Sequence, residues 1–114
     1  MLKICKRVTC GLCLALLSMS AWSGSGAGWT SYGTVGELNP TVFGRFLVKL
    51  DVSENPSGCK NKAWFYRDYD RRGSEYLFHA LLGAVTSDKK VRVYVTGVCD
   101  LDGYSEISSV SVTP

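Results

Sequence analysis

The sequence is poor in the residues that most metal sites and many enzymes need. It contains a single histidine, His79, and only two cysteines after residue 27. Two cysteines and one histidine do not complete a zinc site of four Cys and His ligands, and one isolated imidazole lacks the third group that orients a catalytic base. We therefore expect no metal, no cofactor and no catalytic residue.

Long apolar runs are also missing. The most apolar stretch, residues 8–22, is short and is interrupted by Thr9, Gly11 and Ser18, whereas a permanent membrane span needs about 20 apolar residues. A basic start at residues 3–7 precedes this stretch, and small residues follow at 25–27, which is the pattern of a cleavable export signal. We expect residues 1–27 to be removed and a secreted or periplasmic protein to begin at Gly28.

Removal of this signal changes the charge and cysteine counts. The whole sequence has 13 basic and 10 acidic residues, and the loss of three basic residues would leave 10 of each sign. A neutral domain lacks the excess of cations that binding to nucleic acid requires. The two remaining cysteines, Cys59 and Cys99, are too far apart for a Cys-x-x-Cys redox pair, and in an exported protein we expect them to form a disulfide.

Hydrophobic periodicity predicts a single domain over residues 28–114, mainly β with one helix. Val91, Val93 and Val95 alternate with more polar residues and are expected to face a core, and Ser74 has the chemistry of a helix N-cap. The predicted strands are 33–38, 43–50, 59–66, 91–96 and 107–112, with the helix at 74–86. This β-β-β-α-β-β order matches a small, five-stranded OB-type barrel. An open antiparallel sheet with one packed helix is the alternative, and periodicity does not separate the two.

Carboxylates cluster in two short segments, 68–70 and 100–103. Asp100-Leu101-Asp102-Gly103 resembles the start of a calcium loop, but the remaining ligands of an EF-hand are missing at their required offsets. Turn formation explains both segments, because aspartate bonds its own backbone and glycine tolerates positive φ. We interpret 100–103 as a hairpin connection and the mixed charges of 68–72 as a solvated loop or a salt-bridged rim.

Aromatic residues are the most informative group. Trp and Tyr combine a flat apolar face with a hydrogen-bonding edge, which suits both sugar platforms and protein interfaces. Tyr94 lies out of phase with the inward-facing valines and is expected to be wholly or partly exposed. Half-buried sheet residues are the plainer interpretation of these rings. The candidate ligand-binding residues are Trp29, Tyr32, Trp64, Tyr66, Tyr94 and Tyr104.

Three segments together resemble a known family. Trp29-Thr30, the Val-Gly-Glu-Leu segment at 35–38, and a helix that runs into Val91-Arg92-Val93-Tyr94-Val95 are similar to the B subunits of the subtilase-cytotoxin and pertussis-like AB5 toxins. The resemblance implies an OB-fold that assembles as a ring of five. It further implies binding to sialylated or related host glycans and docking of a toxin A subunit on the ring.

Two main functions remain open from the sequence. The first is an exported, non-catalytic, glycan-directed and oligomeric binding module of the toxin-B type. The alternative is a periplasmic or secreted protein that binds or inhibits another protein, such as a lysozyme or a protease, through loops such as 66–73. A hydrolase using His79, Asp68 and Asp70 ranks third.

Overall fold

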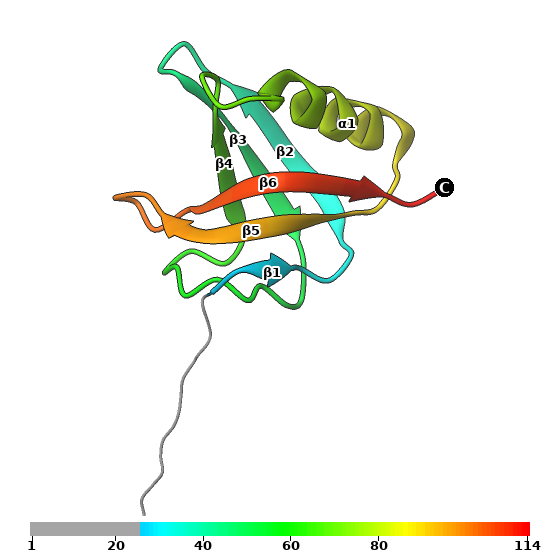
Figure 1. The fold of residues 1–114 in the computed structure, drawn as a ribbon. Coiled ribbons are helices and arrows are strands. Elements are labelled where there is room, and N and C mark those ends of the chain that lie inside the picture. The colour runs from blue at the N-terminus through cyan, green and yellow to red at the C-terminus, as the bar shows by residue number, and fades with distance from the viewer. Residues whose placement is uncertain (1–25) are drawn as a thin grey trace, which may run out of the picture.

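Six strands and one helix make up the described part of the chain. The computed structural model describes residues 26–114, and residues 1–25 of the predicted export signal lie outside it. Figure 1 shows the helix packed across one end of a strongly bent sheet. The elements are β1 (Gly28–Trp29), β2 (Thr34–Pro40), β3 (Arg45–Asp51), β4 (Trp64–Asp68), α1 (Ser74–Ser87), β5 (Val91–Cys99) and β6 (Ser105–Val112).

The strands form one mixed sheet in the order β1-β5-β6-β4-β3-β2. All neighbours are antiparallel except β4 and β6, which run parallel and pair through only two positions, Phe65 with Ser105 and Tyr66 with Glu106. Beyond this short junction the two halves of the sheet diverge, and β5 and β6 cross over β2, β3 and β4 (Figure 1). The inner faces of the two halves therefore face one another.

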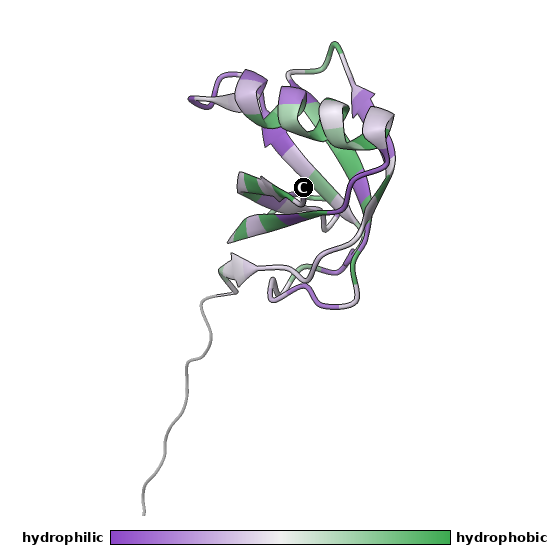
Figure 2. Cartoon of the chain, turned by 90° about the vertical axis from the view of Figure 1, so that its right-hand side faces the viewer, coloured by the Kyte–Doolittle hydropathy of each residue, from purple (hydrophilic) through white to green (hydrophobic). Residues whose placement is uncertain are grey.

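The space between the two halves holds the hydrophobic core. The predicted alternation is confirmed, because Val91, Val93 and Val95 on β5 are all fully buried. Leu81 and Ala84 close the core from α1, and hydrophobic and hydrophilic residues alternate along the strands in Figure 2. The remaining core side chains are Phe46, Val48, Leu50, Phe65 and Ile107. Each fully buried large side chain contributes about 1.5–3 kcal/mol to folding.

The predicted five-stranded barrel is not confirmed, since the sheet has six strands and is not closed. The predicted strand 33–38 is β2, which pairs with β3, and an additional short strand that was not predicted, β1, pairs with β5 at the opposite end of the sheet. Residues 30–33 between them belong to no strand, and Gly33 and Val91 form a single isolated bridge with two hydrogen bonds of 2.8 Å. The bend at these residues interrupts the pairing of this segment with β5.

Two local predictions need correction. The third strand begins at Trp64 and not at residue 59, because the Asn61 side chain accepts hydrogen bonds from the backbone N–H groups of Ala63 and Trp64 and holds a turn there. Ser74 is not the N-cap of α1. The cap is Gly73, at φ 78°, and the Ser74 hydroxyl donates instead to the carbonyl of Tyr69.

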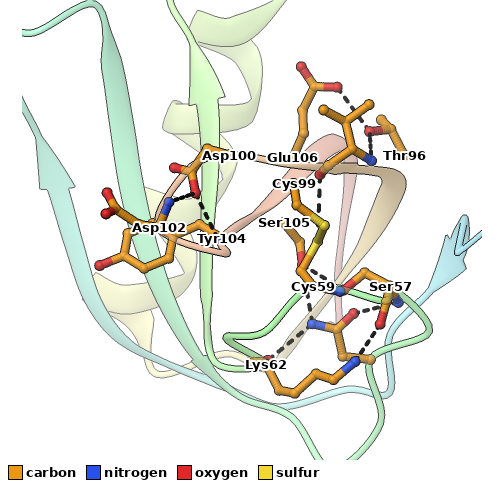
Figure 3. The surroundings of a disulfide bond; sticks show 12 residues. Ser57, Cys59, Lys62, Thr96, Cys99, Asp100, Asp102, Tyr104, Ser105 and Glu106 are labelled. Carbon is orange, nitrogen blue, oxygen red and sulfur yellow. Dashed lines mark hydrogen bonds between the residues drawn. A yellow bond between two sulfur atoms is a disulfide. The ribbon is translucent and has the colours of Figure 1, made fainter.

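The predicted disulfide between Cys59 and Cys99 is formed. It joins the loop before β4 to the end of β5, across a separation of 40 residues and with Cα atoms 5.5 Å apart. Figure 3 shows Ser57 and Ser105 beside it, where their buried hydroxyls share a 2.7 Å hydrogen bond. Lys62 also donates to the Ser57 carbonyl. These contacts hold a loop without regular structure firmly against β6.

Candidate functional site

Three of the six candidate aromatic residues meet on the outer surface of β1, β5 and β6. The register brings Trp29 opposite Tyr94, Tyr94 opposite Ser109, and Arg92 opposite Ser111. Because Val91, Val93 and Val95 point into the core, the even-numbered residues of β5 point outward. We call this surface the Trp29 face; its residues are Trp29, Tyr32, Arg92, Tyr94, Ser109 and Ser111.

The side chains of the Trp29 face contact one another in a fixed arrangement. The Trp29 and Tyr94 rings meet edge to face, with centroids 5.5 Å apart and an interplanar angle of 84°. The Arg92 guanidinium lies 4.5 Å from the centroid of Trp29 and 5.2 Å from that of Tyr32. The hydroxyls of Tyr32 and Ser111 share a 3.3 Å hydrogen bond. Two aromatic rings thus flank one cation.

The rings are accessible to a ligand. Trp29 is 40% exposed and Tyr32 is 43% exposed. Tyr94 is partly buried, as its position in the alternating strand predicts. The face therefore offers apolar ring surface beside several hydroxyl groups.

An open hollow of about 480 Å³ adjoins Trp29. Its far wall is the loop after β3, which is held in place because the Ser31 hydroxyl accepts hydrogen bonds from the backbone N–H groups of Ser53 and Glu54, each 3.0 Å long. A hollow of this volume has the size of a small-molecule site. The lining residues are Trp29, Val52, Ser53, Glu54, Asn55, Pro56 and Lys62.

The other three candidates lie together elsewhere, over β4. Trp64 and Tyr104 stack with centroids 5.9 Å apart and an interplanar angle of 19°. Tyr66 is only 4% exposed, and the Arg45 guanidinium covers its ring at 4.1 Å from the centroid. We therefore withdraw Tyr66 as a ligand-facing residue. Burial, reinforced by the nearby charge of Glu106, raises the pKa of its phenol.

Both acidic segments are used internally. Arg45 forms ion pairs with Asp68 at 3.0 Å and with Asp100 at 2.7 Å, so it ties together the ends of β3, β4 and β5. Asp100 also accepts hydrogen bonds from the backbone N–H groups of Asp102 and Tyr104, which shapes the β5–β6 hairpin (Figure 3). Among residues 26–114, no cluster of three or more His, Cys, Asp or Glu residues is placed to hold a metal ion.

His79 lies on the exposed side of α1. The centroid of its ring is 6.1 Å from that of Phe78. The surface pair with Glu75 that the helical spacing predicts does not form in the described part of the chain. No helix within residues 26–114 has the length and hydrophobicity needed to span a membrane.

Sequence reasoning missed Arg92 as a member of the site. An arginine at an outward position of an alternating strand is ordinary, and its contact with Trp29 depends on β1, a strand of two residues that no periodicity reveals. A usable signal was present, however. Arg92 and Tyr94 occupy the same face of one strand, and no acidic residue lies between 89 and 99 to pair with the arginine.

Comparison of this chain with protein-family models and with curated proteins found no match. Any functional conclusion therefore depends on the geometry of the Trp29 face and of the hollow beside it.

Proposed function

We propose that this protein is an exported, non-catalytic binding module that takes a glycan on the Trp29 face. The observation that carries the proposal is the gathering of three rings on one accessible surface: Trp29 and Tyr32 from one segment flank the Arg92 guanidinium, and Tyr94 from β5 packs against Trp29. Aromatic rings pack against the apolar C–H faces of sugars, while neighbouring polar groups bond the sugar hydroxyls. Ser109 and Ser111 supply such groups.

The backbone around Trp29 is rigid, which favours a binding role. Thr30, the next residue, is buried and exchanges two hydrogen bonds with Val93: its N–H donates to the carbonyl at 2.9 Å, and its hydroxyl accepts from the N–H at 3.1 Å. Gly28 and Trp29 are both paired with β5. Little conformational entropy is lost when a ligand packs on a ring that is already held in place.

The strand order supports an OB-type relationship within this proposal. When β1 and β2 are counted as two halves of one bent first strand, that strand neighbours β3 on one side and β5 on the other. The third and last strands are then β4 and β6, which run parallel, and α1 connects the third strand to the fourth. We propose on this basis that the fold is a distorted OB barrel, open where the first strand bends.

The resemblance to AB5 toxin B subunits extends the proposal to assembly. It implies a homo-oligomeric ring of five that displays its glycan sites to host surfaces and carries an A subunit. A fold alone does not fix a function, so assembly and glycan binding need separate tests.

A glycan array probed with the protein lacking residues 1–27 tests the central claim. We expect the wild-type protein to bind, Trp29→Ala to lose at least about tenfold in affinity through the lost ring contact, and Trp64→Ala to serve as a matched tryptophan control with unchanged binding. Absence of binding to any glycan, or equal loss in both variants, would refute the assigned site.

Sedimentation velocity of the same protein tests the ring. A pentamer supports the toxin-B extension, whereas a monomer that still binds glycan would leave only the binding module. Recovery of one stoichiometric enzyme from a periplasmic extract, without glycan binding, would instead establish the inhibitor alternative.

A further inference from the structure

We propose that Arg92 is an anion-binding residue and that the ligand of the Trp29 face carries an oxyanion, either a carboxylate or a sulfate ester. This inference rests on the proposed glycan-binding function and assigns Arg92 as the residue that selects an acidic over a neutral glycan. The juxtaposition that carries it is a guanidinium held between two exposed aromatic rings without any acceptor of its own.

The other partly or fully buried arginines of this domain all have bonding partners. Arg45 pairs with two aspartates, and Arg67 donates to two backbone carbonyls. The Nε atoms of Arg67 and Arg92 are both shielded from solvent without an acceptor. The terminal nitrogens of Arg67 bond two carbonyls, whereas the guanidinium of Arg92 forms neither a hydrogen bond nor an ion pair within residues 26–114. A shielded donor without a partner is rare in folded proteins and calls for an explanation.

The two rings prepare Arg92 for this role. Trp29 and Tyr32 contact the guanidinium at 4.5 and 5.2 Å from their centroids, which restricts the rotation of an otherwise flexible side chain. The planar fork of an arginine matches a carboxylate or sulfate through two parallel N–H···O bonds. Because the plane is already oriented, an incoming oxyanion meets donors that need little further ordering.

The local charge also favours an anion. None of the six residues of the Trp29 face is acidic, and Lys89 and Lys90 immediately precede β5. The defined face thus carries one positive charge, that of Arg92, although residues 28–114 together carry no net charge; the adjoining hollow contains one residue of each sign, Glu54 and Lys62. The hydroxyls of Ser109 and Ser111 add donors on the same face as the arginine. The charged group of the ligand and the sugar hydroxyls next to it are therefore bonded together.

NMR titration tests the anion site without reference to any glycan. The Nε–H resonance of Arg92 is followed while acetate, sulfate or neutral acetamide is added to the wild-type protein at constant ionic strength. We expect a saturable shift with acetate or sulfate, none with acetamide, and none at the exposed Arg72 as an internal control. Equal responses to acetate and acetamide, or no response at Arg92, would overturn the inference.

Paired glycans then test selectivity, with each neutral glycan compared with its carboxylated and its sulfated form. We expect the wild-type protein to prefer one charged form by about tenfold or more, the ratio expected from one charged hydrogen bond. Arg92→Met, which keeps the stem between the rings, should weaken binding of the charged form about tenfold or more beyond any change for the neutral form and so abolish the preference, while Arg72→Met should change nothing. Preference for a carboxylate or for a sulfate identifies the oxyanion.

The two proposals fail in different ways. A wild-type protein that binds no glycan refutes the proposed function and leaves the NMR titration to decide on Arg92. A wild-type protein that binds neutral and charged glycans equally retains the function and refutes the anion site. If Arg92→Met loses neutral and charged binding alike, Arg92 only positions the rings and the inference is wrong.

Discussion

Arg67 offers the sharpest test of how this sheet holds together. Its side chain points inward from β4 and is only 7% exposed, opposite Phe46 on β3. Its guanidinium donates to the carbonyl of Ile107 at 2.9 Å and to that of Arg72 at 2.7 Å. The β4–β6 ladder has ended one position earlier, so this side chain bridges the two strands where they separate.

The expected change in the free energy of unfolding on Arg67→Met is the balance of two opposing contributions. Arg67→Met removes two hydrogen bonds from a charged donor, each contributing about 1.5–3 kcal/mol, and leaves the buried carbonyl of Ile107 and the partly buried carbonyl of Arg72 without that partner. Relief of the desolvation penalty of a buried cation offsets several kcal/mol of this loss. We expect a net destabilisation of about 2 kcal/mol, which in a domain of this size lowers Tm by about 8–16 °C.

Thermal unfolding of the domain, followed by circular dichroism, measures this change directly. Arg72→Met is the matched control, because it removes an exposed arginine side chain and keeps the backbone carbonyl that Arg67 bonds. Its Tm should change little. If Arg67→Met is as stable as the wild-type protein or more stable, desolvation outweighs the two carbonyl bonds and the bridging role is refuted.

Three further predictions concern the same domain. The double variant Cys59→Ser/Cys99→Ser should lose about 4 kcal/mol in urea unfolding, the chain-entropy value for a loop of 40 residues; a loss below about 1 kcal/mol would contradict that model. Gly33→Ala places a Cβ 2.0 Å from the Asp51 carbonyl oxygen and should destabilise by about 3 kcal/mol, whereas Gly83→Ala, in an open helical position, should stabilise by up to about 1 kcal/mol. Because burial raises the pKa of Tyr66 above its usual 10.0, the folded state keeps the phenol neutral while the unfolded state ionises. The free energy of unfolding should therefore decrease as pH rises above 10.0. Urea titrations at a series of pH values should show a smaller decrease for Tyr66→Phe than for the wild-type protein.

Local periodicity predicted the regular parts of this fold well. The helix expected at 74–86 is α1, Ser74–Ser87, and the valine alternation of β5 correctly identified its buried face. These features depend on residues that are close together in the sequence and on one apolar face of each element that packs on the core. The pairing of Cys59 with Cys99 was also predictable, because only two cysteines follow the expected signal.

Long-range features were less predictable. Strand β1, which was not predicted, depends on a bend at residues 30–33 and on pairing with β5, far away in the sequence. Tyr66 occupies an outward position on β4, yet it is buried and the Arg45 side chain covers its ring. The site was therefore predicted as a set of aromatic residues, and only the fold separated them into two groups and added Arg92.

The bent segment from Gly28 to Pro40 has a consequence for how the chain folds after synthesis. It is the first part of the domain to be made, yet β1 pairs with β5, which lies near the other end of the chain. Until β5 emerges, β1 has no partner, and until β6 emerges the edge of β4 opposite β3 is unpaired. Unpaired strand edges promote aggregation, and distant pairings slow folding. This domain thus completes its sheet only after nearly the whole chain has been made.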